Sequence, residues 1–235
     1  MADAKPMSIP ADPSVRLGKS MGPNGPEEEA EMKKVPFKEA VGSLSFAPQV
    51  TRPDISFAVN AVSQFGSNPG RQHWEAVKKI IRYLKGTTTN KLEYSKRGSS
   101  ELVGFSDADW GGDPDNRRST TGYVFTMQGG AVSWNVKKQL TVALSSCEAE
   151  YMIFEEEPVL IYCDNQGAIN IAGNGAYNPR TKHVSIRYHF VHESLKEGAV
   201  KVKYIPTTDQ PADGFTKLLA IQKQQRFCGL VGVTN

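Results

Sequence analysis

The chain has 235 residues, of which 39% are hydrophobic and 23% charged, and its net charge is +3, as in an ordinary soluble globular protein of one or two domains. The three cysteines show no Cys-x-x-Cys spacing and no apolar run reaches membrane-spanning length, so we expect no disulfide scaffold, no zinc site and no membrane partner. The N-terminus lacks the apolar core of a signal peptide, so we expect an intracellular protein of the cytoplasm or nucleus that is not secreted.

The first 98 residues divide into two stretches. Residues 1–31 are rich in Pro, Gly, Ser and acidic residues without apolar periodicity, so we expect a flexible leader there. Residues 32–98 predict a small helical segment, with helices at 55–65 and 71–85 whose apolar residues recur at three- and four-residue steps. Between Glu31 and Ser100 there are 12 lysines and arginines but 5 aspartates and glutamates, which suits either a polyanionic ligand or a plain solvated face.

The remainder, residues 99–235, predicts strands joined by turns and helices. The expected strands are 102–106, 122–127, 131–136, 158–163 and 199–205. The expected helices are 166–172, 184–196 and a stretch from 207 to about 225. This order predicts an α/β fold in which helices cover a mixed sheet.

Carboxylates follow several of these strands. Asp107 and Asp164 end two apolar runs, Asp213 lies just beyond a third, and Glu148 and Glu150 open a predicted helix. Buried carboxylates are costly to desolvate unless a positive charge pairs with them. Their convergence therefore predicts a divalent metal site made of oxygen ligands.

Several short sequence motifs also indicate a resemblance to a known family. The motifs are Ser106-Asp107-Ala108-Asp109-Trp110, Arg118-Ser119-Thr120-Thr121-Gly122-Tyr123, Glu148-Ala149-Glu150-Tyr151, Tyr162-Cys163-Asp164-Asn165, Arg180-Thr181-Lys182-His183 and Ala212-Asp213-Gly214-Phe215-Thr216-Lys217. In this order they resemble the ribonuclease H domain of copia-type (Ty1-like) LTR retrotransposon Pol polyproteins. Upstream, Thr51-Arg52-Pro53-Asp54-Ile55 and His73-Trp74-Glu75-Ala76-Val77-Lys78 resemble the end of the reverse transcriptase that precedes that domain.

The resemblance implies a ribonuclease H-like, five-stranded mixed sheet flanked by helices in residues 99–235, after a remnant of the reverse transcriptase thumb or connection in residues 32–98. It implies an endoribonuclease that hydrolyses the RNA strand of an RNA–DNA hybrid with two Mg²⁺ ions, Mn²⁺ being the alternative, and no small-molecule cofactor. Other fragments of the polyprotein are further partners that it suggests. The polymerase motif is missing, so no DNA synthesis is expected.

By position, the resemblance gives the catalytic and metal-binding roles to four acids. Asp107 would bridge both ions, Glu150 and Asp164 would each bind one, and Asp213 would be an outer ligand. Glu148 and Glu150 are separated by about 200° on a helix, so both cannot face one site, and the apolar residues after Glu150 favour it over Glu148. For Asp109 we favour a cap on the turn after the strand.

Basic residues provide candidate contacts to nucleic acid. A hybrid duplex is held through its phosphates and 2′-hydroxyls, so its recognition depends on shape. The candidates are Arg117, Arg118, Lys137, Lys138, Arg180, Lys182 and His183. Each is also compatible with an ordinary surface charge, and His183 with packing at a helix start.

One departure from the family leaves an alternative open. Only Tyr151 to Glu157, seven residues, separate Glu150 from Pro158, so the helix after Glu150 is truncated. A crossover to a parallel strand normally needs at least about 10–12 residues including its helix. The alternative is therefore a non-catalytic retrotransposon remnant that at most binds nucleic acid.

Overall fold

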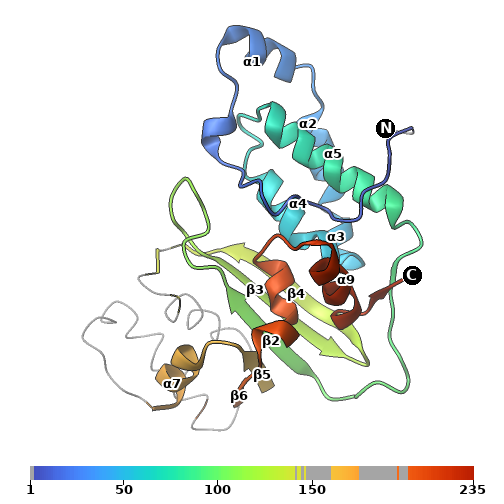
Figure 1. The fold of residues 1–235 in the computed structure, drawn as a ribbon, viewed down its shortest axis with the longest axis vertical. Coiled ribbons are helices and arrows are strands. Elements are labelled where there is room, and N and C mark those ends of the chain that lie inside the picture. The colour runs from blue at the N-terminus through green and yellow to red at the C-terminus, as the bar shows by residue number, and fades with distance from the viewer. Residues whose placement is uncertain (1–2, 141, 144–145, 147–159, 175–194, 196–200) are drawn as a thin grey trace.

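The computed structural model describes residues 3–140, 142–143, 146, 160–174, 195 and 201–235. Figure 1 shows helices gathered at one end of the molecule and a sheet at the other. The α-helices, with the 3-10 helices written η, are η1 (Lys19–Met21), α1 (Pro26–Met32), α2 (Phe37–Leu44), α3 (Ala47–Val50), η2 (Pro53–Ile55), α4 (Ser56–Ser63), α5 (Arg71–Gly86), α7 (Gln166–Asn174), η4 (Thr207–Asp209), η5 (Pro211–Phe215) and α9 (Ile221–Leu230). The strands are β1 (Lys91–Leu92), β2 (Val103–Ala108), β3 (Thr120–Met127), β4 (Gly130–Lys138), β5 (Leu160–Cys163), β6 (Lys201–Tyr204) and β7 (Val233–Thr234).

The helical end has its own apolar core, built mainly by α2, α4 and α5. The predicted helix at 71–85 is confirmed as α5, and the one at 55–65 as η2 followed by α4. Phe37, Val62 and Ile80 are each at most 2% exposed and meet between these helices. The three- and four-residue spacing of the apolar residues thus places one face of each helix inside this core.

The first 31 residues differ from the expected flexible leader. Helices η1 and α1 form there, and the segment before them runs along α5. The Met7 N–H donates to the Arg82 carbonyl at 3.2 Å, and Asp12 pairs with Lys79 at 2.9 Å. The Gly18 carbonyl lies 3.1 Å from His73 Nε2. The polar face of α5, which the sequence left open to phosphate or solvent, therefore contacts the chain's own N-terminal segment.

The second part is the predicted mixed sheet, with five strands in the order β4-β3-β2-β5-β6. Strands β2, β3 and β4 pair antiparallel, whereas β5 and β6 run parallel to β2. This order and these directions give the ribonuclease H-like sheet that the resemblance implied, and all five predicted strands are confirmed. A further antiparallel pair joins β1, where the sequence of residues 91–94 also favours a short strand, with β7. Only β7 was missed, because two residues are too few to show a periodicity.

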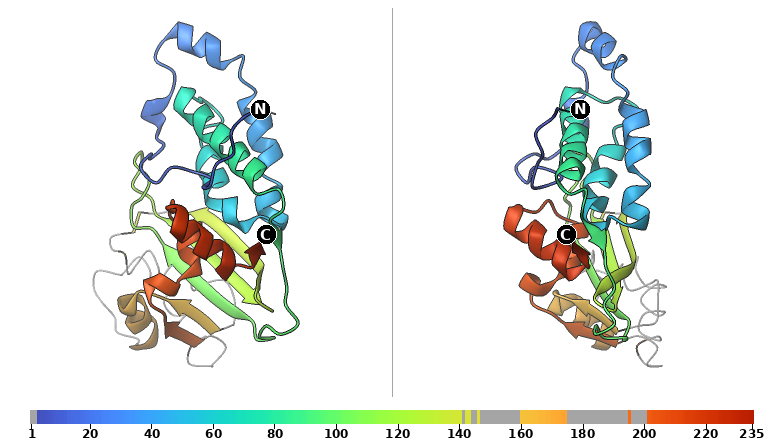
Figure 2. Two further views of the ribbon diagram at one scale, coloured as in Figure 1. Left: turned by 45° about the vertical axis from the view of Figure 1, so that its right-hand side comes forward. Right: turned by 90° about the vertical axis from the view of Figure 1, so that its right-hand side faces the viewer.

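Helix α9 covers one face of this sheet (Figure 2). Phe227 meets Phe215 edge to face at 5.2 Å between ring centres, and both pack with Val124 of β3. The apolar cluster fixes η5 and α9 against β3, and η5 also contacts β2. Every helix among the described residues is too short or too polar to cross a lipid bilayer.

The two parts are joined by buried polar contacts. Arg52 and Asp54 form a two-pronged ion pair with distances of 2.7 and 2.8 Å, and Tyr83 donates to Asp54 at 2.7 Å. From α9, Gln224 Nε2 donates to the Asp54 carbonyl at 3.1 Å. The Trp134 indole of β4 donates to the Pro48 carbonyl at 2.6 Å. The two parts on either side of the predicted domain boundary near residue 98 are therefore packed against each other.

Candidate metal centre

Strand register brings the first two acids together. Parallel pairing matches Phe105 of β2 with Tyr162 of β5, and their rings stack at 5.5 Å. Asp107 and Asp164 each lie two residues further along, so the same register places them side by side on one face of the sheet. The Thr207 hydroxyl donates to Asp164 at 2.6 Å and ties it to the turn after β6.

The third acid arrives on η5. Gln210 anchors this helix to the sheet, because its Nε2 donates to the Ser106 carbonyl at 3.0 Å in a buried setting. Gly122 of β3 allows the close approach: a Cβ there would lie 2.6 Å from the Phe215 Cβ and 2.9 Å from a methyl carbon of Thr216. A glycine in the Thr-Thr-Gly-Tyr motif therefore decides whether η5 can deliver Asp213 to the site.

The three aspartates form one cluster. One carboxylate oxygen from each of Asp107, Asp164 and Asp213 lies within 4.8 Å of the others. Thr216 Oγ1 donates to Asp107, which is 2% exposed. The Lys217 ammonium lies 2.7 Å from Asp213 and 3.2 Å from Asp107. Asp107 is therefore held from two sides before any ligand binds.

Burial dominates the electrostatics of the cluster. It raises the pKa of Asp107, although Lys217 opposes that rise, and it raises the pKa of Asp213 in the same way. Burial lowers the pKa of Lys217, but Asp107 and Asp213 together raise it by more, so the net shift is upward. Burial also raises the pKa of Asp109 to about 6, although its carboxylate accepts a hydrogen bond from the Thr120 N–H. That hydrogen bond links the start of β3 to the residue after β2, so Asp109 stabilises the end of the strand, as the expected capping role requires.

These donors fit a hard divalent cation. Three carboxylates meet with no thiol or imidazole among the cluster's members, and such oxygen sets suit Mg²⁺, Ca²⁺ and Mn²⁺ rather than zinc. Carboxylates this close repel one another, and a cation relieves the repulsion. The cluster therefore has both the donor chemistry and the electrostatic need for a divalent ion.

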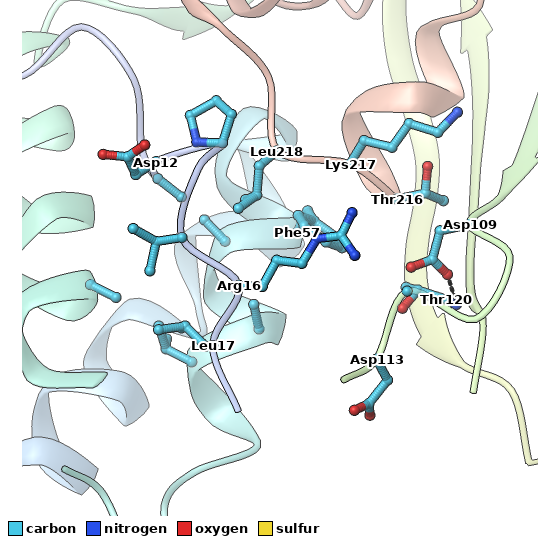
Figure 3. A pocket seen from close by; sticks show the side chains of 18 of the residues that line it. Asp12, Arg16, Leu17, Phe57, Asp109, Asp113, Thr120, Thr216, Lys217 and Leu218 are labelled. Carbon is cyan, nitrogen blue, oxygen red and sulfur yellow. Dashed lines mark hydrogen bonds between the residues drawn. The ribbon is translucent and has the colours of Figure 1, made fainter. Parts of the chain in front are cut away.

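The cluster opens into a cleft between the two parts of the molecule. The cleft has a volume of about 1410 Å³, and its walls include the three site residues Asp107, Asp164 and Lys217, the 109–114 loop, α4, α5 and the N-terminal segment. In Figure 3 the Arg16 side chain extends from that segment between Phe57 and the loop that carries Asp109 and Asp113. A polyanion entering this cleft would meet the acids at one side and Arg16 at the other.

Comparison with known proteins identifies the family. Over 99% of its length the chain is 44% identical to the retrovirus-related Pol polyprotein from transposon TNT 1-94 of Nicotiana tabacum, and over its whole length it is 38% identical to that from transposon RE1 of Arabidopsis thaliana. The chain belongs to the copia-type retrotransposon Pol family. It spans only 19% and 17% of these two relatives. It is also 54% identical over 125 residues to secreted RxLR effector protein 161 of Plasmopara viticola, covering 53% of this chain and 88% of that protein.

Other comparisons are weaker. No protein-family model matches the chain. A ribonuclease H1 from Halobacterium salinarum shares 16% identity over 49% of this chain and 94% of its own, with a TM-score of 0.36. A foamy viral protease–reverse transcriptase in complex with dsDNA shares 13% identity over 79% of this chain and 42% of its own, with a TM-score of 0.48. The fold assignment rests on the strand order and directions described above.

The Pol relatives also carry residues that this chain lacks. The alignment with the TNT 1-94 polyprotein extends over 253 positions, whereas the chain has 235 residues. At least 18 positions of the relative thus have no counterpart here. This copy of the Pol sequence is therefore shortened internally.

The basic residues predicted to contact nucleic acid fall in different places. Arg117 is exposed and lines the cleft, and its neighbour Arg118 is half-buried outside the cleft lining. Lys138 also reaches the cleft, but it is paired with Asp113 and donates to Gln64. Lys137 precedes it on β4, so its side chain points to the opposite face of the sheet from the three acids. Arg117 is thus the best placed of these four for a ligand in the cleft.

Several predicted residues lie outside the described part of the chain. They are Glu148, Glu150, Arg180, Lys182 and His183, together with the predicted helix at 184–196. Their roles stay predictions. Trp110, the last residue of the first motif, has 59% of its surface exposed, although its indole N–H donates to the Ala143 carbonyl at 3.1 Å.

Sequence reasoning missed three residues of the site. Thr216 and Lys217 belong to a motif that was read only for Asp213, and the spacing of four from Asp213 to Lys217 was the available signal for an ion pair. Arg16 gave no signal, because its place beside the cleft depends on contacts between the N-terminal segment and α5.

Proposed function

We propose that this chain is the ribonuclease H part of a copia-type Pol polyprotein and that it hydrolyses the RNA strand of an RNA–DNA hybrid. The observation that carries the proposal is the cluster of Asp107, Asp164 and Asp213, which strand register and η5 assemble at the wall of a cleft. Membership of the Pol family supplies the reaction class. Residues 32–98 would then be the end of the reverse transcriptase and residues 99–235 the nuclease domain.

The proposed cofactor is a pair of Mg²⁺ ions, with Mn²⁺ as the substitute. Bound ions of this kind activate water and stabilise the leaving oxygen of a phosphodiester. Asp107 would bridge the pair, Asp164 would bind one ion and Asp213 would be the outer ligand. Glu150 is the proposed fourth carboxylate, and it lies outside the described residues.

The residues around the acids would hold them ready for this chemistry. Thr216 fixes the orientation of Asp107, and Thr207 does the same for Asp164. Asp107 is 2% exposed and lines the cleft. Preorganised ligands need little rearrangement when charge develops on the phosphate.

The hybrid would enter through the cleft. Arg117 and Arg16 line it, and both are exposed cations that form no ion pair with the residues the structure describes, so they can contact phosphates directly. Such contacts are independent of sequence and weaken as salt rises, because binding releases counterions. Arg180, Lys182 and His183 are further proposed contacts, and other fragments of the polyprotein are proposed partners.

A specific observation supports a second candidate, a non-catalytic remnant that still binds nucleic acid. The Pol relative carries at least 18 positions that this chain lacks. The sequence places one shortening directly after Glu150, where a helix should support that ligand. A remnant of this kind would retain the cleft and its arginines while losing hydrolysis.

The test is a cleavage assay on a hybrid whose RNA strand is labelled, with Mg²⁺, comparing the wild-type chain, Asp107→Asn and Asp209→Asn. Asp209 is the matched control, since its side chain is 49% exposed and lies outside the aspartate cluster. The proposal expects cleavage that Asp107→Asn reduces by at least about 100-fold, the order of effect seen when a group that stabilises developing charge is lost, and that Asp209→Asn leaves intact. Equal cleavage by wild type and Asp107→Asn would refute it. Hybrid binding without cleavage would establish the remnant.

A further inference from the structure

Lys217 occupies the position where two of the three carboxylates converge. Its Nζ lies 2.7 Å from Asp213 Oδ1 and 3.2 Å from Asp107 Oδ2, with the other Asp107 oxygen at 3.3 Å. The Lys217 N–H also donates to the Asp213 carbonyl at 2.9 Å, closing one helical turn. Residues four apart on such a turn project from the same side. The backbone therefore directs the lysine back onto its own aspartate and across to Asp107.

The positive charge of Lys217 offsets the repulsion between the clustered carboxylates when no metal ion is bound. Asp107 and Asp213 are both largely buried, and Asp164 adds a third carboxylate within 4.8 Å. Like charges at that separation disfavour the ionised forms unless a positive charge is nearby. Asp109, at the end of β2, also interacts electrostatically with Lys217. Lys138 of β4 acts on Asp109 as well, but it is already paired with Asp113. Lys217 thus neutralises charge in the aspartate cluster, whereas Lys138 pairs with Asp113 in the 109–114 loop.

A divalent ion at the aspartates would need the same oxygens. The carboxylate atoms that contact the ammonium are among those that could bind such an ion, and two cations cannot share them closely without repulsion. The Lys217 side chain is 41% exposed at the open side of the site, so it has room to swing into the cleft. Its four-carbon stem is flexible enough for that movement.

We propose that Lys217 is the built-in counter-ion of the metal-free site and that it competes with the divalent cation for Asp107 and Asp213. The inference rests on the proposed function only in taking the aspartates as cation ligands. Binding of the ion replaces the ammonium, and the released lysine then faces the cleft. Lys217 is in this sense a positioning residue: it keeps the acids together while the site is empty and weakens the site's affinity for metal.

The experiment uses the full chain with Mg²⁺ alone as the probe. Lys217→Met removes the charge and keeps most of the stem, Lys217→Arg keeps the charge, and Lys203→Met is the control because Lys203 is exposed on β6. Mg²⁺ affinity is measured by calorimetry, and thermal melting is followed with a chelator and with Mg²⁺. Neither measurement depends on nuclease activity.

For Lys217→Met we expect Mg²⁺ binding to tighten by about 5- to 100-fold, the usual range of coupling between two competing sites. Its melting temperature should fall below the wild-type value in chelator and recover with Mg²⁺. Lys203→Met should match the wild type, and Lys217→Arg should stay as stable as the wild type in chelator. If Lys217→Met does not fold, a Lys217→Arg chain that binds Mg²⁺ as the wild type does still supports the proposal, and one that is unstable in chelator overturns it.

Two other outcomes separate this inference from the proposed function. Wild type and Lys217→Met with equal Mg²⁺ affinity, or weaker binding by the variant, would overturn the role of Lys217 and leave the metal centre standing. A wild-type chain that binds no Mg²⁺ would overturn the metal centre itself and, with it, the competition.

Discussion

Replacing Gly122 by alanine tests how η5 is positioned against β3. The added Cβ would lie 2.6 Å from the Phe215 Cβ, 2.9 Å from the Thr216 methyl carbon and 3.1 Å from the Phe215 carbonyl carbon. Carbon atoms prefer separations of about 3.5–4.0 Å, so η5 must move by roughly 1 Å or the sheet must bend. One of these neighbours is backbone, and Phe215 is fully buried, so the clash cannot be relieved by a side-chain rotation alone.

The expected loss of stability follows from two opposing effects. Overpacking of a core costs about 1–3 kcal/mol. Alanine in a strand regains about 0.5–1 kcal/mol over glycine, because glycine loses more backbone freedom on folding. We therefore expect Gly122→Ala to lower the free energy of unfolding by about 1–2 kcal/mol.

Urea denaturation followed by circular dichroism measures this loss. The matched control is Gly173→Ala in α7, where an added Cβ meets none of the described residues within 4 Å, and where alanine should stabilise the helix by up to about 1 kcal/mol. The same shift of η5 should separate Asp213 from Asp107 and weaken Mg²⁺ binding in calorimetry. Gly122→Ala with wild-type stability and wild-type Mg²⁺ affinity would refute the idea that this contact sets the distance between the two acids.

Three further predictions concern buried polar groups. Burial lowers the pKa of His73, so as the pH falls through about 6.5 the unfolded chain binds a proton at this residue before the folded chain does. The free energy of unfolding should therefore decline from about pH 6.5 downward until the folded-state pKa is passed. Denaturation midpoints measured at several pH values should show a smaller decline for His73→Gln than for the wild type. Asp54→Asn should lower the free energy of unfolding by about 3–5 kcal/mol in urea denaturation, because it leaves the buried Arg52 without its counter-charge. Asp12→Asn, at a more exposed ion pair, should change the midpoint little. Equal effects of the two variants would refute the argument that burial makes the Asp54 pair more important. Thr216→Val should cost about 1.5–3 kcal/mol by removing the hydrogen bond to the buried Asp107 carboxylate, and Thr216→Ser should retain most of it; identical midpoints for the two variants would show that the bond contributes nothing.

Much of the fold could be predicted because its elements are periodic. Helix α5 and strands β2 to β4 each repeat an apolar pattern that only one type of element satisfies. The order of the acids along the chain likewise predicted the cluster of Asp107, Asp164 and Asp213, since strand ends converge at one edge of a sheet.

What the sequence did not reveal depends on contacts between distant segments. The N-terminal segment has no pattern of its own, and its position is set by ion pairs and carbonyl contacts with α5. Lys217 was overlooked because a lysine four residues after an aspartate is usually a surface pair, and only η5's docking on the sheet turns it toward Asp107. The pairing of Lys138 with Asp113 had no sequence signal either, because the two residues come from a strand and a separate loop.

The joint between the two parts has a consequence for how such a chain would respond to proteolysis. The covalent link between them passes through residues 96–98, yet Gln224 reaches Asp54, Trp134 reaches Pro48 and β7 pairs with β1. The last of these contacts holds the C-terminal end against residues that precede the link. A protease that cut at residues 96–98 would therefore yield two peptides that remain one particle, distinguishable by denaturing electrophoresis but not by gel filtration. A fragment prepared from residue 99 onward would instead expose the Trp134 ring edge and the Gln224 amide, which now contact the helical part.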